Sequence, residues 1–482
     1  MRRTKIICTI GPASERPEVI RALIEAGMNV ARLNMSHGSL EEHAARIRAI
    51  REEARQAGQD VGILLDIQGP KIRLGQFGEP VVLDVGDRIR LTSEPVPCGR
   101  ERVSVSYPYL ARDLTPGRHI FIDDGLIELL VEKVEGSDVI CQTLVGGELR
   151  SRKGVSLPGV IVDLPPATEE DAVHLRFGVE QGVDWIAASF VRRAEHVETI
   201  RSLVRQAGGD QPIMAKIESE EGLSHIDEII AAADGVMVAR GDLGVETPLE
   251  EVPLAQQMIV AKCNEAGKPV VTATQMLESM VQNHRPTRAE VTDVAHAIFD
   301  GTDAVMLSGE TAVGRYPVDT VRIMARICER MEAALPYEDL LAKRRAWARQ
   351  DVAEAISYAT CQTAADLGVA AILTSTQSGS TARMVSKYRP HAPIVAVTPD
   401  EKVARRLCLV WGVEPLVVRP AEDIDEMLDT AVEAALKAGL VQPGQRIAIS
   451  AGVKTNVPGS TNLLQVLEVT ERGRAVPASS IR

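Results

Sequence analysis

The sequence predicts an α/β protein in which a (β/α)8 barrel, or TIM barrel, carries an inserted all-β domain and is followed by a C-terminal α/β domain. Apolar, β-branched runs alternate with amphipathic helical stretches until eight such runs are present. The alternation stops once, between Gly69-Pro70 and Leu164-Pro165-Pro166, where short strands and turn residues replace it. A second strand–helix alternation starts at about residue 350. An open doubly wound sheet is the alternative for the first part.

The barrel is predicted for residues 1–70 and 167–340. In chain order its strands are "TKIICTIG", "MNVARLN", "GILLDIQG", "DWIAASF", "PIMAKIES", "GVMVARGD", "PVVTATQ" and "DAVMLSGE". Stretches such as "PEVIRALIEAG", "LSHIDEIIAAA" and "LAQQMIVAKCNEAG" have helical spacing, and several end in Gly before the next strand. Every strand also ends in polar or glycine-bearing residues. Because ligands bind at the carboxyl ends of parallel strands, these residues predict a site at the barrel mouth.

The insert is predicted for residues 71–166 and is expected to overhang that mouth, bounded by prolines that suit hinges. It is either a lid or an inert decoration. The C-terminal domain, residues 350–474, contains the strand-like runs "AAILTSTQSG", "PIVAVTPD", "EPLVVRP", "QRIAISAG" and "LLQVLEV".

Composition limits the classes of partner. The chain has 482 residues, 45% of them hydrophobic and 25% charged, which is typical of folded domains. A net charge of −13 disfavours nucleic acid and anionic membranes as main partners, but leaves small anionic ligands open. The seven cysteines are scattered without a Cys-x-x-Cys pair, which favours the reducing cytoplasm. The basic start, "MRRTKIICTIGPAS", has too short an apolar run for a signal peptide or a membrane span.

Two carboxylates follow neighbouring strands, Glu218 in "AKIES" and Asp242 in "MVARGDLGVE". Carboxylates with few nitrogen or sulfur ligands nearby favour a hard divalent cation such as Mg2+ or Mn2+. Asp242 as a simple turn cap, and Lys216 with Glu218 as a structural ion pair, are the alternatives. Strict strand alternation is expected to turn Lys216 away from the carboxylates, so a bend or bulge would be needed to bring all three together.

Cations and hydroxyls occupy other strand ends. "ARLNMSHG" supplies Arg32, Asn34, Ser36 and His37, and "DIQGPKIR" supplies Lys71 and Arg73. Such a rim above two carboxylates suits a site that holds both metal and phosphate. The amides of Gly241 and Asp242 can receive a carboxylate or phosphate if a short helix starts there. Thr274 and Ser308 offer hydroxyls for proton relay, and no P-loop motif is present.

Several motifs together resemble the pyruvate kinase family. They are "TKIICTIGPAS", "MNVARLNMSHG", "KIES-EEG", "MVARGDLGVE", "AGKPVVTATQMLESM" and "RPTRAEVTDVAHAIFDGTDAVMLSGETAVGRYP", and the likeness runs in family order to the end of the C-terminal domain. It implies a glycolytic enzyme that transfers the phosphoryl group of phosphoenolpyruvate to ADP, giving pyruvate and ATP. It also implies Mg2+ or Mn2+ as cofactor, a lid formed by the insert, a regulatory C-terminal domain, a homotetramer and a cytoplasmic location.

The resemblance also implies a role for each matching residue. Glu218 and Asp242 bind the metal. Lys216 neutralises the moving phosphoryl group, and Arg32 clamps phosphate. The Gly241 and Asp242 amides with Thr274 hold the substrate carboxylate, while Thr274 and Ser308 serve the proton relay. The matches to family nucleotide contacts are Asn34, His37, Arg73 and Lys153. The matches to the loop that binds a phosphorylated effector are Thr376, Gln377, Ser378, Gly379, Ser380 and Thr381, with "GVKTNVPGST" closing over it.

The chain departs from the better-known family pattern in two places. Potassium-dependent relatives carry Glu where this chain has Lys71, and usually Thr where it has Ile67. In those relatives K+ is surrounded by oxygens that match Asn34, Ser36, Asp66 and the carbonyl of Ile67. Here the Lys71 ammonium is expected to substitute for that ion, so K+ is not expected to be required. The alternative is that Lys71 only binds a neighbouring carboxylate.

The second departure is Ser380, which stands where some relatives carry a basic residue. A sugar monophosphate or AMP is therefore a better expectation than a bisphosphate, and an ordinary capped turn is the alternative to any effector site. For the whole chain, the competing functions are a divalent-metal aldolase or lyase acting on pyruvate enolate and a non-catalytic phosphometabolite sensor. The first predicts no phosphate-binding arginine and no Lys153, and the second predicts loss of Lys216 or of a metal carboxylate.

Overall fold

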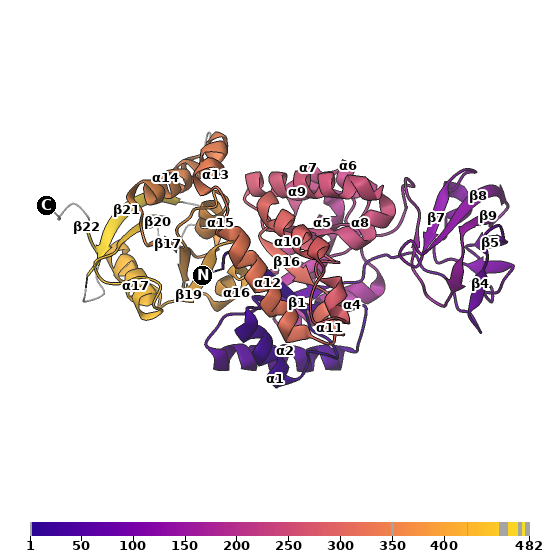
Figure 1. The fold of residues 1–482 in the computed structure, drawn as a ribbon, viewed down its shortest axis with the longest axis horizontal. Coiled ribbons are helices and arrows are strands. Elements are labelled where there is room, and N and C mark those ends of the chain that lie inside the picture. Colours follow the sequence, from indigo (N-terminus) through magenta and orange to yellow (C-terminus); the bar gives the residue numbers. More distant parts are fainter. Residues whose placement is uncertain (1, 349–350, 422, 453–460, 471–474, 478–482) are drawn as a thin grey trace.

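The computed structural model describes residues 2–348, 351–421, 423–452, 461–470 and 475–477. Three bodies lie in a row along its longest axis (Figure 1). The barrel is in the middle, the insert is at one end, and the C-terminal domain is at the other. The two outer bodies therefore contact opposite ends of the barrel.

Eight parallel strands close into a ring in the order β1-β16-β15-β14-β13-β12-β3-β2. They are β1 (Lys5–Thr9), β2 (Val30–Asn34), β3 (Gly62–Asp66), β12 (Trp185–Ala188), β13 (Ile213–Ile217), β14 (Gly235–Ala239), β15 (Val270–Ala273) and β16 (Ala304–Leu307). Each of the eight predicted runs forms one of these strands. The closed ring confirms the barrel and excludes the open sheet.

Helices surround the ring. They are α1 (Pro17–Ala26), α2 (Leu40–Ala57), α4 (Glu169–Glu180), α5 (Ala194–Gln206), α6 (Glu220–Ser224), α7 (Ile226–Ala232), α8 (Arg240–Glu246), α9 (Val252–Ala266), α10 (Arg288–Asp300), α11 (Gly309–Ala312) and α12 (Pro317–Glu332), with 3-10 turns η1 (Leu249–Glu251) and η2 (Glu278–Val281). Capping boxes start α2, α4 and α10. The stretch "LSHIDEIIAAA" is not one helix, because α6 ends at Ser224 and α7 begins at Ile226, with His225 between them.

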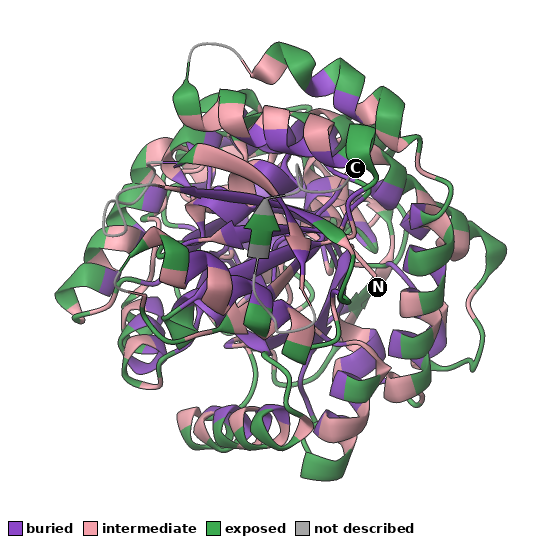
Figure 2. Cartoon of the chain, turned by 90° about the vertical axis from the view of Figure 1, so that its left-hand side faces the viewer, coloured by how far each residue is buried: buried purple, intermediate pink, exposed green. Residues whose placement is uncertain are grey.

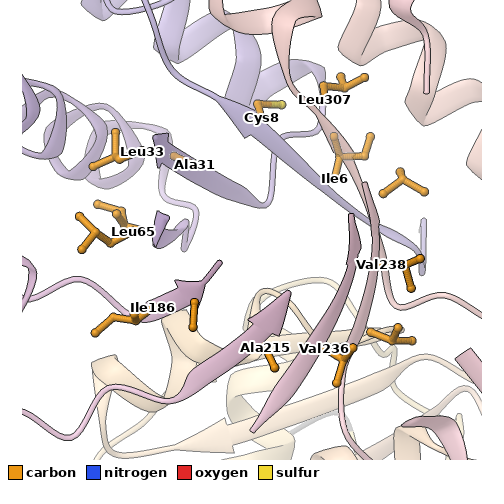
Figure 3. Packing of buried hydrophobic residues seen from close by; sticks show 14 of the residues in the cluster. Ile6, Cys8, Ala31, Leu33, Leu65, Ile186, Ala215, Val236, Val238 and Leu307 are labelled. Carbon is orange, nitrogen blue, oxygen red and sulfur yellow. The ribbon is translucent and has the colours of Figure 1, made fainter. Parts of the chain in front are cut away.

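Two apolar layers hold the barrel. Strand side chains such as Ile6, Leu65 and Val236 pack into one cluster with helix residues, and Figure 3 shows this packing on neighbouring strands. The alternate side chains fill the inside of the ring, as the period of two along a strand requires. Two residues of the C-terminal domain, Cys408 and Leu409, belong to this inner cluster. The C-terminal domain therefore completes the interior of the barrel.

The insert has a core of its own. Its strands are β4 (Val81–Leu83), β5 (Arg88–Thr92), β6 (Arg102–Ser104), β7 (His119–Ile122), β8 (Ile127–Glu135), β9 (Asp138–Val145), β10 (Gly147–Leu149) and β11 (Val155–Ser156). They form sheets β10-β4 and β11-β7-β8-β9-β5-β6. One helical turn, α3 (Leu110–Asp113), makes the insert β-rich rather than wholly β.

The C-terminal domain is a second α/β layer structure. The connecting elements α13 (Tyr337–Arg344) and η3 (Arg345–Trp347) come before it. Its own elements are α14 (Val352–Leu367), β17 (Ala371–Ser375), α15 (Ser380–Ser386), β18 (Ile394–Thr398), α16 (Glu401–Leu407), β19 (Val413–Val417), α17 (Ile424–Lys437), β20 (Arg446–Gly452), β21 (Thr461–Val469) and β22 (Ala475–Pro477). The sheet order is β19-β18-β17-β20-β21-β22. Seen from this end, buried residues fill the centre and exposed ones lie outside (Figure 2).

A buried ion pair joins this domain to the barrel. Arg389 Nη1 lies 3.0 Å from Asp303 Oδ1, and both side chains are almost fully buried. Lys5 Nζ donates to the carbonyl of Val413 at 2.6 Å.

Among the helices of the described residues, none is long and apolar enough to cross a membrane.

Candidate active site

A cavity of about 610 Å³ lies at the carboxyl ends of the barrel strands and continues to the insert. Most of the predicted site residues line it: Arg32, Asn34, Ser36, His37, Asp66, Ile67, Lys71, Arg73, Lys216, Glu218 and Asp242. They come from β2, β3, β13 and the turns that follow these strands and β14. Because the barrel is parallel, residues more than 200 positions apart in the chain share one wall.

Lys216 lies at the centre of this wall. Its ammonium nitrogen is 3.0 Å from Glu218 Oε1 and 3.3 Å from Asp66 Oδ1, and it donates to Ser189 Oγ at 2.7 Å. Burial alone would lower the pKa of Lys216, but Asp66 and Glu218 raise it to about 12. The side chain is therefore a fixed positive charge at any working pH.

The expectation that Lys216 needs a bulge to reach the carboxylates is wrong. The register between β13 and β14 runs without a break from Met214 to Ile217. Lys216 and Glu218 are two residues apart, so regular pleating points both to the same side of the sheet. Met214, two residues earlier, belongs to the inner cluster of the barrel, which places all three side chains on the inner face.

Arg32 and Asp66 form a second buried pair in the same wall. Arg32 Nε lies 2.6 Å from Asp66 Oδ2, and its Nη1 donates to Thr9 Oγ1 at 3.0 Å. Burial would raise the pKa of Asp66, but Lys216 and Arg32 lower it below its usual value. The pair holds the guanidinium of Arg32 at the cavity surface, where its charge is suited to an anionic ligand.

Asp242 sits in the first turn of α8, so the predicted short helix is present. Its Oδ1 lies 2.8 Å from the ammonium of Lys71, which is also 3.5 Å from Asp124 Oδ1. Burial disfavours the charge on Lys71, but Asp242 outweighs it and raises the pKa of Lys71. Lys71 therefore stays cationic on the wall that also carries Asp242.

Glu218 and Asp242 suit a divalent cation whose coordination shell is completed by substrate oxygens. Glu218 and Asp242 line the same cavity, and burial, together with the proximity of Asp242, raises the pKa of Glu218 against the opposing effect of Lys216. Nothing within the described residues assembles three or more His, Cys, Asp or Glu side chains into a metal cluster. Mg2+ is commonly held by one or two carboxylates plus phosphate oxygens and waters, so the donor set fits this ion.

Thr274 and Gly241 meet at the neighbouring strand ends. The amide of Gly241 donates to Thr274 Oγ1 at 2.8 Å, and that hydroxyl donates to the carbonyl of Ala273 at 2.6 Å. Thr274 has a φ of 71°, which a β-branched residue rarely adopts. The Ser308 hydroxyl, after β16, is buried and has no hydrogen-bond partner in the described part of the chain.

The nucleotide residues divide into two groups. Asn34, His37 and Arg73 line the cavity, and Arg73 Nη1 donates to the carbonyl of Arg152 at 3.0 Å. Lys153 lies in the insert outside that lining, where its ammonium is 2.8 Å from Asp123 Oδ1.

Ser189 and Phe190 belong to the site although the sequence did not single them out. Ser189 Oγ donates to the carbonyl of Ile67 at 2.8 Å, and the amide of Phe190 donates to Glu218 Oε2 at 2.6 Å. Both line the cavity, and both end the predicted strand "DWIAASF", whose polar end was the available signal.

The predicted effector loop joins β17 to α15. The Thr376 amide donates to the carbonyl of Val397 at 3.0 Å, and Thr381 Oγ1 lies 2.8 Å from Thr461 Oγ1 of β21. Arg383 Nη1 donates to the carbonyl of Ser378 at 3.2 Å, and Gly379 adopts a φ of 77° before the helix. Of the loop "GVKTNVPGST", which is predicted to close over the effector, residues 453–460 lie outside the described residues.

The comparisons with known proteins all indicate the same family. The family described as pyruvate kinase, barrel domain, matches residues 1–321, and pyruvate kinase, alpha/beta domain, matches residues 354–467. The chain is 52% identical to a pyruvate kinase of Geobacillus stearothermophilus over 474 residues, 98% of this chain and 81% of that protein. It is 49% identical to one of Clostridium acetobutylicum over 473 residues, 97% of this chain and 99% of that protein.

Proposed function

The chain belongs to the pyruvate kinase family, and from that premise we propose how the side chains at its barrel mouth perform the reaction. The enzyme transfers the phosphoryl group of phosphoenolpyruvate to ADP, giving pyruvate and ATP. This activity sets aside the lyase and the non-catalytic sensor. The observation that carries the site assignment is the buried ammonium of Lys216, held between Asp66 and Glu218 on the wall of the cavity.

Lys216 and Arg32 serve the phosphoryl group. As the bond between phosphorus and the enol oxygen breaks and a terminal ADP oxygen bonds to phosphorus, negative charge spreads over the transferring oxygens. A fixed ammonium and a guanidinium at the cavity surface neutralise that charge without reorganising. Glu218 and Asp242 would hold Mg2+, which supplies further charge neutralisation when bound.

Thr274 and Ser308 serve the enolate that the transfer leaves behind. This enolate of pyruvate needs one proton at C3. Hydroxyls relay a proton through water without holding a charge themselves. The Thr274 hydroxyl already accepts a hydrogen bond from the Gly241 amide, which fixes its position between the ends of β14 and β15. The amides of Gly241 and Asp242 lie at the start of α8 and would hold the substrate carboxylate, with the Gly241 amide shared between that carboxylate and the Thr274 hydroxyl to which it donates at 2.8 Å.

Asn34, His37, Arg73 and Lys153 are assigned to ADP. The first three lie on the cavity wall, and Lys153 is carried by the insert. Movement of the insert as a lid would bring Lys153 to the nucleotide and exclude water that otherwise hydrolyses the phosphoryl donor. The domain limits 71–166 for the lid and 350–474 for the effector domain belong to the same proposal.

A charge-removing change at Asp242 tests the metal assignment. In a coupled assay of pyruvate formation from phosphoenolpyruvate and ADP, Asp242→Asn is expected to raise the half-saturating Mg2+ concentration by about tenfold or more. The matched control is Asp124→Asn, because Asp124 also faces Lys71 at 3.5 Å but lies largely exposed. A Mg2+ dependence of Asp242→Asn equal to that of Asp124→Asn contradicts the assignment.

The loop Thr376–Thr381 is assigned to a phosphorylated effector, with a sugar monophosphate or AMP as the expected class. Its hydroxyls and amides precede α15, and Thr381 ties the loop to β21 through Thr461. The same proposal includes a homotetramer as the assembly through which the effector acts. It also includes a cytoplasmic location, which the seven free cysteines support.

Removing two hydroxyls of this loop is expected to flatten activation. Thr376→Ala with Thr381→Ala removes two donors to a phosphate, and each lost bond weakens the affinity for an activator by about tenfold. The measurement is the rate at subsaturating phosphoenolpyruvate over a titration of phosphorylated metabolites. Thr398→Ala, at the end of the adjacent strand β18, is the control. A potent activator that acts equally on the double variant places the effector site elsewhere.

A further inference from the structure

Arg240 is a buried cation of the barrel mouth to which the mechanism above gives no task. It is the first residue of α8, directly before Gly241 and Asp242. Its side chain is only 11% exposed, and Nη1 lies 2.6 Å from Asp293 Oδ1 of α10. The other guanidinium nitrogens are directed to β15, where Nη2 donates to the carbonyl of Thr274 at 2.9 Å and Nε to that of Ala273 at 3.4 Å.

These carbonyls belong to an unusual turn. Thr274 and Gln275 have φ angles of 71° and 54°, so two consecutive residues with side chains lie in the left-handed region. Such a conformation persists only where the surroundings hold it in place. The bonds from Arg240 fasten the carbonyls on both sides of Thr274, and Nη2 also contacts Met276 Sδ at 2.8 Å. One guanidinium therefore clamps the turn from a neighbouring strand end.

The clamp is connected to the groups assigned to substrate. The amide next to Arg240, that of Gly241, donates to the Thr274 hydroxyl at 2.8 Å. Arg240 holds the Thr274 backbone while its own chain neighbour holds the Thr274 side chain. The position of the hydroxyl is thus set relative to the start of α8, and relative to Asp242, by two contacts from consecutive residues.

Side chains of α9 and α10 hold the Arg240 guanidinium on the side away from the Thr274 turn. Asp293 holds Nη1, and Gln256 of α9 accepts from the same nitrogen at 3.4 Å while donating to Asp300 at 2.9 Å. A planar guanidinium held on one edge by a carboxylate presents its other edge in a fixed direction, which a lysine ammonium cannot do.

We propose that Arg240, oriented by Asp293, is a positioning residue that fixes the Thr274–Gln275 turn so that the Thr274 hydroxyl is placed for enolate protonation. The inference rests on the proposed role of Thr274. It assigns Arg240 no contact with substrate. The residue acts through the turn, and a guanidinium rather than a positive charge alone is required.

The test separates proton transfer from phosphoryl transfer. Arg240→Gln is expected to lower the exchange of the pyruvate C3 hydrogens with solvent by about 10²-fold, as misplacement of a reacting group does. Arg240→Lys keeps the charge but not the fork, and its exchange is expected to fall almost as far. Asp293→Asn is expected to lower exchange in the same direction by about tenfold, because it weakens the anchor. The KM for ADP is expected to stay within about twofold of wild type, since the nucleotide residues lie on other strands.

The control is Arg201→Gln. Arg201 also pairs with a carboxylate, Asp234 at 2.8 Å, and donates to a carbonyl, that of Ala232 at 2.7 Å, but at the opposite end of the barrel. Normal exchange in Arg240→Gln, or an equal fall in exchange, phosphoryl transfer and ADP binding, overturns the inference. Thr274→Ala distinguishes the two proposals. Unchanged exchange in Thr274→Ala defeats the assigned role of Thr274, whereas lost exchange there with normal exchange in Arg240→Gln defeats the clamp alone.

Discussion

Lys216→Met is expected to lower phosphoryl transfer by about 10²–10³-fold while much of the C3 proton exchange of pyruvate survives. The change removes the ammonium that faces the transferring oxygens but leaves Thr274 and Ser308 in place. The variant is also expected to fold, because each carboxylate keeps another donor. Asp66 retains Arg32 at 2.6 Å, and Glu218 retains the Phe190 amide at 2.6 Å. The measurements are the coupled pyruvate assay and hydrogen exchange followed by NMR.

Lys268→Met is the matched control. Lys268 precedes β15 at the other end of the barrel, where its ammonium donates to the carbonyls of Ile230, Ala231 and Ala233. Near-normal transfer is expected in that variant. Equal losses of transfer and exchange in Lys216→Met argue that Lys216 supports the metal carboxylates rather than the phosphoryl group.

We propose that the wild-type enzyme works without K+, and we expect Lys71→Glu to make it require this ion. We expect substantial wild-type activity with Mg2+ when tetramethylammonium is the only monovalent cation. Among the groups that match a K+ site, Asp66, the Ile67 carbonyl and Asn34 already have donors. Arg32 and Lys216 hold Asp66, Ser189 holds the Ile67 carbonyl, and the Ser36 amide holds Asn34 Oδ1. A carboxylate at position 71, near Asp242 and Asp124, would add the negative charge that K+ compensates.

The expected loss for Lys71→Glu in tetramethylammonium is about 10²-fold, the usual effect of losing one charge-stabilising contact, with recovery on adding K+. Lys133→Glu makes the same charge change at an exposed side chain of β8 in the insert and is expected to leave the monovalent requirement unchanged. A wild-type enzyme that needs added K+ for all but residual turnover contradicts the proposal that the Lys71 ammonium substitutes for K+. Lys71 then serves only as a partner of Asp242.

The strand pattern was sufficient to predict the barrel and most of the cavity wall. Each apolar run ends in polar residues, and parallel closure brings those ends together, so Lys216, Glu218 and Asp242 could be placed without coordinates. The predicted bulge at Lys216 was wrong. Lys216 and Glu218 are two residues apart, so they share a face of the strand without one.

Other parts of the site depend on contacts that composition and spacing do not reveal. The Phe190 amide that binds Glu218 is a backbone donor, and any residue type supplies one. Thr274 has a left-handed φ that its residue type disfavours, so the sequence gives no signal for the turn. Arg240 was visible as a polar residue at a strand end, but its bonds to the neighbouring strand follow only from the ring order of β14 and β15.

The insert and the C-terminal domain are attached to the barrel in different ways, and this determines which of them can be exchanged for a domain of another protein. The chain enters and leaves the insert at adjacent points, since the amide of Gly69, before the insert, donates to Asp171 Oδ1, after it, at 3.1 Å. With a separate core, the insert is a cassette whose exchange for another module leaves the ring closed. The C-terminal domain is not interchangeable in this way, because Cys408 and Leu409 are part of the barrel's interior packing. A chimera that takes this domain from another protein has to supply side chains that fill the places of Cys408 and Leu409 inside the barrel.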